Sequence, residues 1–272
     1  MVRVNEHKTS TAVVRMDAAG LHYKELNARL RNAVAAGAQR IELVNIHGQR
    51  YIGTDLDSAV DIHIHGTPGN DLGAFMDGPR ITVHAHAQDG CGNTMNQGEI
   101  VIHGHAGDIL GLSARGGRIF VRDNVGYRTG IHMKQYQDAR PVVVVGGTAQ
   151  DFLGEYMAGG VLVLLGLTLG AGETHRSRFI GTGMHGGVIY LRGSVESHQL
   201  GKEVGVAEMG AEDTALLSEL VGQYVAYFGG DADAILSGPF IKLVPLYLRP
   251  YGNLYAPTHR GAQGVVRRMG RG

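Results

Sequence analysis

Residues 62–121 decide the fold of this chain, because they repeat with a period of 19 residues. The stretch reads IHIHGTPGNDLGAFMDGPR from Ile62, ITVHAHAQDGCGNTMNQGE from Ile81, IVIHGHAGDILGLSARGGR from Ile100 and IFV from Ile119. A fixed period of about 20 residues is typical of a solenoid, in which each unit buries its apolar edge only by stacking on its neighbours.

Each unit predicts a short strand followed by glycine corners. The alternation of apolar and polar residues at the start of every unit is the two-residue period of a half-buried strand. Glycine allows positive φ angles and close approach of neighbouring coils, whereas each glycine would cost a helix about 1 kcal/mol relative to alanine. The sequence therefore predicts a mainly β fold, a β-solenoid with parallel coils. The predicted structural repeat glycines are Gly66, Gly69, Gly73, Gly92, Gly107, Gly111, Gly130, Gly154 and Gly181.

The composition fits thin aliphatic ladders rather than a bulky aromatic core. The chain has 272 residues, 43 glycines, no tryptophan and a formal net charge of zero. This neutral balance gives no indication of binding to nucleic acid or an anionic membrane, and no apolar run is long enough to span a bilayer. Cys91 is the only cysteine, which excludes an internal disulfide and a cysteine-cluster metal site. The polar N-terminus has no secretory signal pattern, so we expect a cytoplasmic protein.

The repeat divides the chain into four segments. We expect an N-terminal extension and cap over residues 1–52, the β-helix repeat over 53–205, a C-terminal helical extension over 206–260 and a disordered tail over 261–272. A solenoid needs a cap because an open end exposes both the apolar ladder and unpaired backbone groups.

The predicted cap consists of a helix and strands. The apolar spacing indicates a helix over 21–36, with Asp17 as its N-cap and Gly37 as its stop. Strands are expected over 41–46 and near Tyr51–Ile52, and residues 1–14 are expected to be extended or mobile.

The later coils carry two insertions. The step from Gly130 to Gly154 is 24 residues and the step to Gly181 is 27, so loops are expected near 134–140 and 166–178. Insertions of this kind leave a solenoid as surface loops. The later ladder strands are predicted at 142–145, 161–165 and 188–191, and the repeat fades after about Leu200.

The C-terminal extension contains a second helix. The stretch DTALLSELVGQYVAYF, residues 213–228, has an apolar stripe at helical spacing, with Asp213 or Thr214 as its N-cap and Gly229-Gly230 at its end. Residues 240–248 are expected to be a strand or an extended packing segment.

The histidines of the repeat form a column. The 19-residue step aligns His65, His84 and His103 and ends at Arg122. Stacked imidazoles could share a zinc ion. The sequence favours instead an outward polar ladder, because no carboxylate or cysteine joins the column and histidines in line do not converge on one ion. We therefore predict no metal site, and a partner-facing column that responds to protonation stays open.

Other motifs follow the repeat and give no catalytic residue. Gly181-Thr-Gly-Met-His-Gly186 has the letters of a dinucleotide fingerprint, but a strand is expected after it where a helix is required. Ser113 lies in GLSARG, which lacks the elbow of a serine hydrolase. Turn chemistry through Asx-type hydrogen bonds is expected for Asp71, Asp89, Asp108 and Asp151. Core packing is expected for Met76, Met95, Met133, Met157 and Met184.

These patterns resemble a known family. The segments Gly66-Thr-Pro-Gly69-Asn-Asp-Leu-Gly73, Glu155-Tyr-Met-Ala-Gly-Gly160 and Gly183-Met-His-Gly-Gly187, with the helix at 213–228, resemble the C-terminal GXGXG domain of the glutamate synthase large subunit. A component of formylmethanofuran dehydrogenase carries a similar repeat. The resemblance implies a single-stranded right-handed parallel β-helix without cofactors of its own, in a complex whose FMN and iron–sulphur clusters lie on partner subunits.

The resemblance implies a non-catalytic structural subunit of a multi-subunit glutamate synthase-type complex, which braces separate glutamine amidotransferase and synthase chains in glutamate biosynthesis. One alternative is the corresponding subunit of formylmethanofuran dehydrogenase or of a formyltransferase/hydrolase complex. A second is a subunit of N-methylglutamate synthase. A third, from another class, is a stand-alone hydrolase that uses Ser113.

Overall fold

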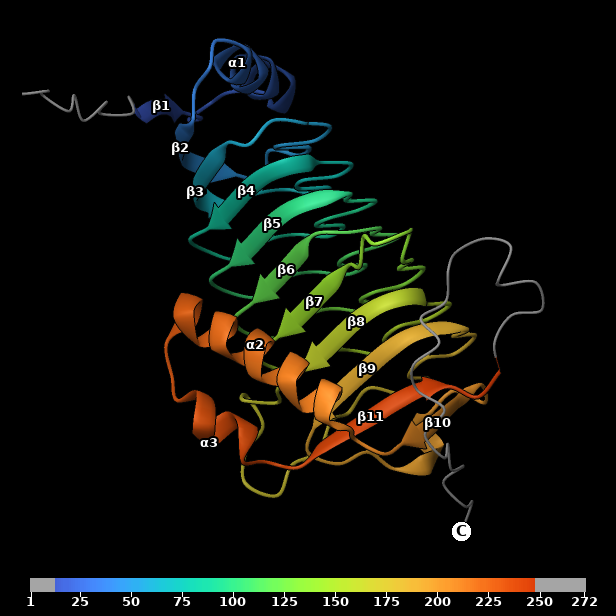
Figure 1. Ribbon diagram of the computed structural model, residues 1–272. Helices are drawn as coiled ribbons and strands as arrows, with labels where there is room; N and C mark the ends of the chain where they lie inside the picture. Colours follow the sequence, from blue (N-terminus) through green and yellow to red (C-terminus); the bar gives the residue numbers. More distant parts are fainter. Residues whose placement is uncertain (1–12, 248–272) are drawn as a thin grey trace, which may run out of the picture.

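The computed structural model describes residues 13–247, which form a parallel β-solenoid (Figure 1). All strands belong to one 11-stranded sheet with the order β1-β2-β3-β4-β5-β6-β7-β8-β9-β11-β10. The coil strands are β2 (Arg40–His47), β3 (Asp61–Thr67), β4 (Asp77–Val83), β5 (Gln97–Ile102), β6 (Arg118–Val121), β7 (Val142–Val145), β8 (Ala158–Leu164) and β9 (Gly186–Arg192). The predicted β-solenoid, with a helix–strand cap and a helix after the repeat, is confirmed.

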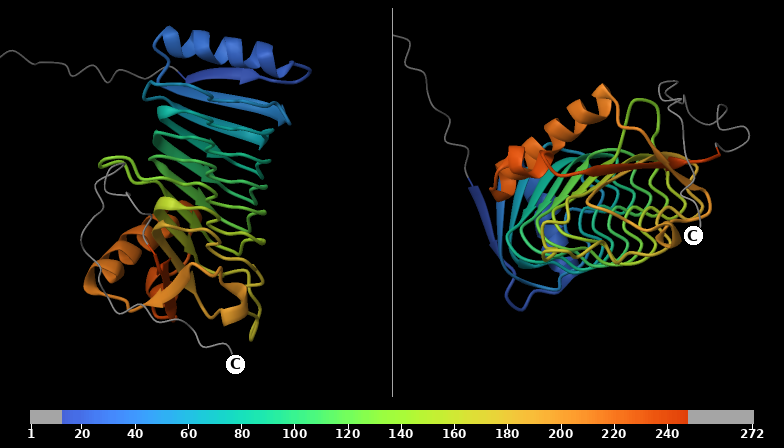
Figure 2. Two further views of the ribbon diagram at one scale, coloured as in Figure 1. Left: turned by 90° about the vertical axis from the view of Figure 1, so that its right-hand side faces the viewer. Right: turned by 90° about the horizontal axis from the view of Figure 1, so that it is seen from below.

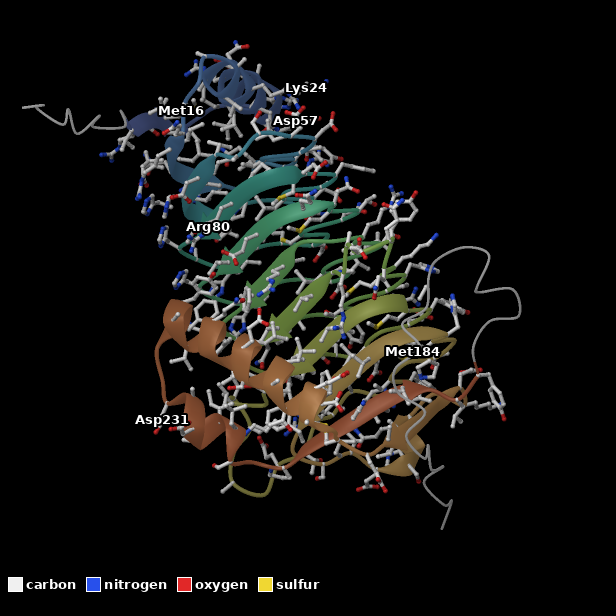
Figure 3. The ribbon with its side chains drawn as sticks, viewed as in Figure 1. Met16, Lys24, Asp57, Arg80, Met184 and Asp231 are labelled. Carbon is white, nitrogen blue, oxygen red and sulfur yellow. The ribbon has the colours of Figure 1, made fainter. Side chains whose placement is uncertain are left out.

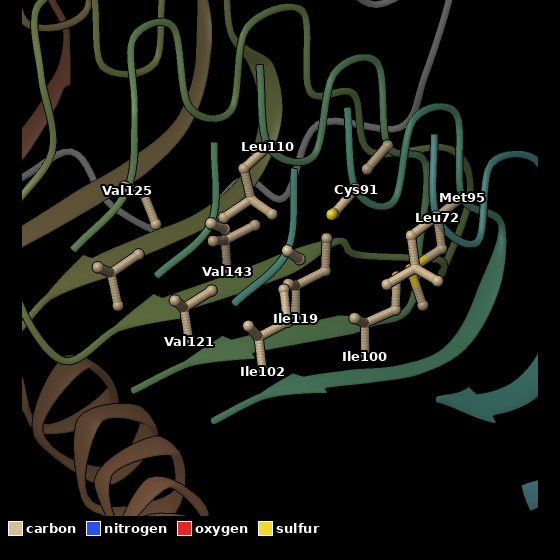
Figure 4. Packing of buried hydrophobic residues seen from close by; sticks show 14 of the residues in the cluster. Leu72, Cys91, Met95, Ile100, Ile102, Leu110, Ile119, Val121, Val125 and Val143 are labelled. Atoms are coloured by element: carbon tan, nitrogen blue, oxygen red, sulfur yellow. The ribbon is translucent and has the colours of Figure 1, made fainter. Parts of the chain in front are cut away.

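The register of the sheet follows the 19-residue period. Ile62 pairs with Ile81, Ile81 with Ile100 and Ile100 with Ile119, all in parallel strands. These residues are at most 1% exposed, and they face the opposite wall of the coil across an apolar core (Figure 4). The ladder therefore supplies the main apolar stabilisation, since each buried aliphatic side chain contributes about 1.5–3 kcal/mol.

The glycine corners have two different physical causes. Gly130 has φ 74°, its N–H donates to Leu110 O of the preceding coil at 2.8 Å, and a Cβ there would meet Leu162 Cδ1 at 2.7 Å. The same left-handed conformation recurs at Gly73, Gly92, Gly111, Gly154 and Gly181. Gly107 does not have a positive φ. Glycine is needed at this position because a Cβ atom would collide with the Asp89 carboxylate of the preceding coil.

The coils also turn at residues that are not glycine. Phe75, Thr94, Ser113, His132 and Tyr156 follow the corner glycines by two positions and have φ between 52° and 59°. Each places an ordinary side chain in a backbone conformation that normally favours glycine. The coil corners therefore include residues with positive φ that are not glycine, in addition to the glycines from which we predicted the corners.

The N-terminal cap differs from the prediction at its edges. Strand β1 (Val13–Asp17) pairs in parallel with β2, and helix α1 (Tyr23–Ala35) covers the end of the coil stack (Figure 2). The N-cap of α1 is His22, because the Asp17 carboxylate instead accepts from Ala19 N and Asn45 Nδ2, both at 2.9 Å. The strand predicted near Tyr51–Ile52 is wrong; this segment is a turn.

Helix α2 (Ala211–Phe228) covers the outer face of the sheet (Figure 1). Its buried residues Leu217, Leu220 and Val221 belong to one cluster with the outward residues Phe120 and Val163 of the sheet. Asp213 is not the N-cap of α2 but lies in its first turn, where its carboxylate accepts from Gly210 N at 2.7 Å. Gly229 ends the helix with φ 80°, as predicted.

The segments around α2 complete the sheet. Strand β11 (Phe240–Pro245) pairs antiparallel with both β9 and β10 (Val204–Ala207). The short helices α3 (Ala232–Leu236) and η1 (Ser197–Gln199) were not predicted, because five residues or fewer show no helical period. Strand β10 was not predicted, because its partner β11 lies beyond α2 in the chain. The predicted extended segment beyond residue 247 and the tail over 261–272 lie outside the described residues.

A buried polar network fastens α2 to the sheet. Asp213 accepts from Tyr190 Oη at 2.5 Å and from Lys242 Nζ at 2.8 Å, and all three side chains are at most 11% exposed. Burial acts against the carboxylate charge, but the hydrogen bonds from Lys242, Tyr190 and Gly210 N outweigh it and lower the pKa of Asp213. Burial and the Asp213 carboxylate raise the pKa of Tyr190.

Both predicted insertions are surface loops. In the first, Tyr136 and Ala139 exchange two backbone hydrogen bonds at 3.1 and 3.0 Å, and residues 136–140 are exposed. The second has no regular secondary structure over 165–178. Two of its side chains, His175 and Ser177, are 1% exposed, so this loop is anchored to the coil at its C-terminal end.

Candidate interaction surface

The outer face of the sheet changes from polar to apolar along the solenoid. Most outward residues of β6–β9, such as Val144, Val163 and Tyr190, are apolar and lie beneath α2. Outward residues of β2–β5 are mostly polar, and no helix lies over β2–β4 (Figure 1). We call this region the open face. Its polar residues are Arg40, Glu42, Asp61, His63, His65, Arg80, Thr82, His84, Glu99 and His103.

One column of the open face alternates in charge. Parallel pairing places Arg40 beside Asp61, Arg80 next in the column, then Glu99 and Arg118. Ion pairs join Arg40 to Asp61 at 3.8 Å and Arg80 to Glu99 at 3.2 Å; Arg80 is among the labelled side chains of Figure 3. Exposed pairs of this kind contribute about 1 kcal/mol or less each, so they specify register more than they add stability.

The histidine column lies beside the charged column. The rings of His65 and His84 stack with centroids 4.6 Å apart, and those of His84 and His103 with centroids 5.5 Å apart. Arg122 takes the next position, where its guanidinium pairs with the Asp123 carboxylate at 3.1 Å. The structure thus brings the three predicted histidines together, whereas Arg122 has a partner of its own.

A fourth histidine, His63, lies outside this column and links it to the Asp61 carboxylate. Nε2 of His63 lies 3.1 Å from Asp61 Oδ2, and its Nδ1 lies 3.0 Å from Nε2 of His84. The ring planes of His63 and His84 differ by 14°, and the ring centroids are 5.3 Å apart. That distance equals the 3.0 Å between the two bonded nitrogens plus the distance from nitrogen to centroid in each ring, so the rings lie side by side and not one above the other. The two imidazoles therefore meet edge to edge, in a chain from Asp61 through His63 to His84.

Two histidines of the column have lowered pKa values. Burial and the neighbouring imidazoles of His65, His63 and His103 lower the pKa of His84. Burial and the Arg122 charge lower the pKa of His103. Burial opposes the charge of Glu42, but hydrogen bonds from His65, at 2.7 Å, and from Arg40 lower its pKa overall. The surroundings therefore favour the neutral imidazole at His84 and His103 and the ionised carboxylate at Glu42.

Among residues 13–247, no group of three or more histidine, cysteine, aspartate or glutamate side chains could hold a metal ion. The geometry gives the reason for the histidine column: its rings lie in nearly parallel planes, and both nitrogens of His63 and Nε2 of His65 and of His84 already have partners.

The acidic repeat and the second histidine pair join neighbouring coils. Asp89 Oδ1 accepts from Asp108 N, and Asp108 Oδ1 from Tyr127 N, at 2.9 and 2.8 Å; Asp151 accepts from the next coil in the same way. His86 Nδ1 likewise accepts from His105 N at 2.9 Å. The predicted Asx-type turns are wrong for these aspartates, because their partners lie in the next coil rather than in the same turn.

Ser113 and the Gly181–Gly186 motif lie at coil corners. Ser113 has φ 54°, its N–H donates to Ile131 O at 2.9 Å, and its hydroxyl has no histidine within hydrogen-bond distance among the described residues. Gly181 and Gly183 both have positive φ, and strand β9 begins at Gly186, so no helix N-terminus faces this motif. Cys91 is fully buried, and burial raises the pKa of its thiol to about 12.

The end of α2 borders the open face, and the sequence did not predict this. Phe228 meets His103 edge-on at 5.1 Å, and Tyr227 Oη donates to Glu99 at 2.9 Å with Arg80 5.4 Å above its ring. A shallow groove of about 320 Å³ continues beneath this end, between Arg122 and Arg192. The apolar outward residues from Phe120 onward were the available signal that a helix covers this part of the sheet.

None of the described helices is long and apolar enough to cross a membrane.

Comparison with known proteins agrees with this architecture. The chain is 46% identical over 250 residues to an uncharacterized protein of Methanocaldococcus jannaschii, a match that covers 89% of this chain and 96% of that protein. The structure is similar to a chain of the formyltransferase/hydrolase complex of Methylorubrum extorquens, solved with methylofuran, with a TM-score of 0.58 and 17% identity over 83% of this chain and 91% of that chain. At that identity the likeness concerns the fold alone. The family model described as the GXGXG motif matches residues 22–247, and the chain belongs to this family.

Proposed function

We propose that the chain is a non-catalytic structural subunit of a multi-subunit enzyme complex and that its open face docks a catalytic partner. One observation supports this proposal most strongly: α2 covers one part of a continuous sheet, and no described helix lies over strands β2–β4 of the same sheet (Figure 1). Beneath α2 the outward residues are apolar, whereas on β2–β4 the same positions carry His63, His65 and His84 in an ordered hydrogen-bonded array.

The repeat itself supports a scaffolding role. Each coil is fixed by backbone hydrogen bonds to both neighbours, and side chains such as Asp89 and Asp108 add further inter-coil bonds. A rigid stack of this kind keeps a surface in constant geometry over its whole length. The motifs that could have carried chemistry, Ser113 and Gly181–Gly186, are used as corners.

The likeness in fold to a chain of a formyltransferase/hydrolase complex favours a complex of that type. It covers 83% of this chain and 91% of that chain, so the comparison concerns most of the fold rather than a fragment. This supports the first alternative drawn from the sequence more than it supports glutamate synthase.

A glutamate synthase-type complex is the second candidate. The segment Glu155-Tyr-Met-Ala-Gly-Gly160 favours it through its resemblance to the glutamate synthase domain. In that case FMN and iron–sulphur clusters are expected on the partner subunits, and N-methylglutamate synthase is a related assembly with the same expectation. No observation favours a stand-alone hydrolase, because Ser113 serves as a corner residue.

Purification of the native complex tests the proposal. The chain is isolated from its source under mild conditions, and co-purifying chains are identified by mass spectrometry. We expect at least one catalytic chain in stoichiometric amount. A formyltransferase among these chains would support the first candidate, and a glutamine amidotransferase would support the second. A monomer with no stable partner would contradict the proposal.

A pair of variants tests the docking face. The double variant His65→Ala/His84→Ala should lose the partner, whereas His132→Ala should retain it, because His132 is an exposed histidine that stacks on Tyr156 at a corner away from the sheet. Circular dichroism checks that both variants fold. If both variants retain the partner equally, the interface does not lie on the open face and this part of the proposal is wrong.

A further inference from the structure

The carboxylates of the open face determine which nitrogen of each imidazole carries the proton. Asp61 can only accept, so His63 donates to it through Nε2–H and is left with an unprotonated Nδ1. His84 must then donate through its own Nε2–H to that Nδ1. Glu42 fixes His65 in the same tautomer through the 2.7 Å contact with Nε2.

Two acceptor nitrogens are left over. Nδ1 of His65 and Nδ1 of His84 are unprotonated in these tautomers, and neither has a hydrogen-bond partner among residues 13–247. The rings are stacked at 4.6 Å, and the His65 side chain is 47% exposed. The open face therefore presents a short row of hydrogen-bond acceptors at about the spacing of the coils.

From this arrangement we infer that the open face binds a partner segment that presents lysine or arginine side chains to His65 and His84. The local charge agrees, because Arg40 faces two carboxylates, Glu42 at 2.9 Å and Asp61 at 3.8 Å. The other arginines nearby each have one carboxylate partner, Arg80 with Glu99, Arg118 with Glu219 and Arg122 with Asp123, so one carboxylate is in excess. An acidic segment would meet lone pairs and that excess negative charge. The inference rests on the proposed docking function and names the chemistry of the partner.

A metal ion shared by His65 and His84 fits the same nitrogens less well. Zinc needs each nitrogen at about 2.0–2.1 Å, and rings in parallel planes with centroids 4.6 Å apart cannot both reach one ion at that distance without leaving the stack. Donor side chains have no such requirement, because each imidazole can accept a separate hydrogen bond.

The tautomers can be observed directly. In long-range ¹H–¹⁵N spectra of histidine-labelled full-length protein at neutral pH, we expect His63, His65 and His84 as Nε2–H forms with unprotonated Nδ1. A proton on Nδ1 of His65 and His84 would overturn the inference, because the acceptor row would not exist.

Binding is tested with polyarginine and polyglutamate of equal length as probes. Polyarginine should shift the ring signals of His65 and His84, and the double variant His65→Ala/His84→Ala should weaken its binding at least about tenfold, since two hydrogen bonds to charged donors are lost. His132→Ala, the matched control, should bind as the parent chain does. Stronger binding of polyglutamate at these rings, or equal polyarginine binding by the parent and the double variant, would overturn the inference.

The pH dependence gives a second readout. The groups around His84 are Glu42 from β2, His63 and His65 from β3, and His103 directly after β5, with Asp61 bonded to the far side of His63. Protonation of the column removes the acceptors and adds positive charge, so polyarginine binding should fall on acidification; a rise would contradict the inference. If polyarginine binds as expected but no catalytic chain co-purifies, the proposed function fails and this inference stands.

Discussion

Nε2 of His84 lies 3.0 Å from Nδ1 of His63, although the two residues are 21 positions apart and do not share a column of the repeat. The contact crosses from the column of His65, His84 and His103 to the neighbouring column of Glu42 and His63. The repeat thus produces a two-dimensional array on the sheet, in which His84 has neighbours along its column, His65 and His103, and another across it, His63.

Substitution of a corner glycine should destabilise the solenoid. Gly130→Ala places a Cβ 2.7 Å from Leu162 Cδ1 at φ 74°, so we expect a loss of about 2–4 kcal/mol from backbone strain and overpacking together. Urea denaturation followed by circular dichroism measures the change. The control is Gly222→Ala in α2, which meets nothing within 4 Å and should stabilise the helix by up to about 1 kcal/mol. Equal effects would argue against the corner geometry.

Loss of the buried lysine should be costly. Lys242→Met leaves the Asp213 carboxylate without its ion-pair partner in a site where both side chains are at most 11% exposed, and we expect about 3–5 kcal/mol of destabilisation. The double variant Lys242→Met/Asp213→Asn should recover part of this loss in chemical denaturation. Arg176→Met removes an exposed pair with Glu173 and should change the free energy of unfolding by about 1 kcal/mol or less.

The stability should fall on mild acidification because of His175. This side chain is 1% exposed, its Nε2 contacts Arg192 O at 2.9 Å, and burial lowers its pKa from the ordinary value of 6.5. The unfolded chain then binds more protons than the folded chain below about pH 6.5, so the free energy of unfolding decreases as the pH falls through that value. His175→Gln can still donate to Arg192 O and should flatten this decrease. His198→Gln, at an exposed position, should leave the slope unchanged.

The first insertion should be dispensable for folding. Removal of residues 135–139 shortens the step between the corner glycines from 24 to 19 residues and restores the basic repeat length. The removed hairpin is largely exposed, so we expect a change in the free energy of unfolding of about 1 kcal/mol or less. Collapse of the fold in thermal unfolding would mean that the loop contributes to the coil.

Cys91 should be inert in the folded protein. Its side chain is fully buried, Sγ lies 3.3 Å from Gln88 O, and burial raises the thiol pKa to about 12. A colorimetric thiol reagent at neutral pH should react with it only after denaturant is added, because the thiolate is the reactive form. Rapid reaction with the native chain would indicate that this part of the core opens.

The sequence was sufficient for the solenoid because the fold depends on one periodic constraint. Every inward residue of β3–β6 contacts its own equivalents one repeat away, so a count of 19 gives both the strands and their register. The same count located the two insertions. It also aligned His65, His84 and His103, since residues in register on parallel strands must lie in a column.

The prediction failed where the deciding partner lies outside the repeat or in another coil. Asp17 matched an N-cap by local rules, but Asn45, 28 positions away, holds its carboxylate. Asp89 and Asp108 matched turn residues, but their acceptor oxygens face the coil that follows. Strand β10 was missed because it is defined by pairing with β11, which lies beyond α2 in the chain.

The sequence by itself therefore determined the period, the ladder and the column, because these depend on spacing along the chain. Only the tertiary structure decided which part of the sheet α2 covers, which carboxylate faces each imidazole, and that Ser113 is a corner rather than a nucleophile. Those outcomes depend on the packing of segments far apart in the sequence, which the spacing of the repeat does not specify.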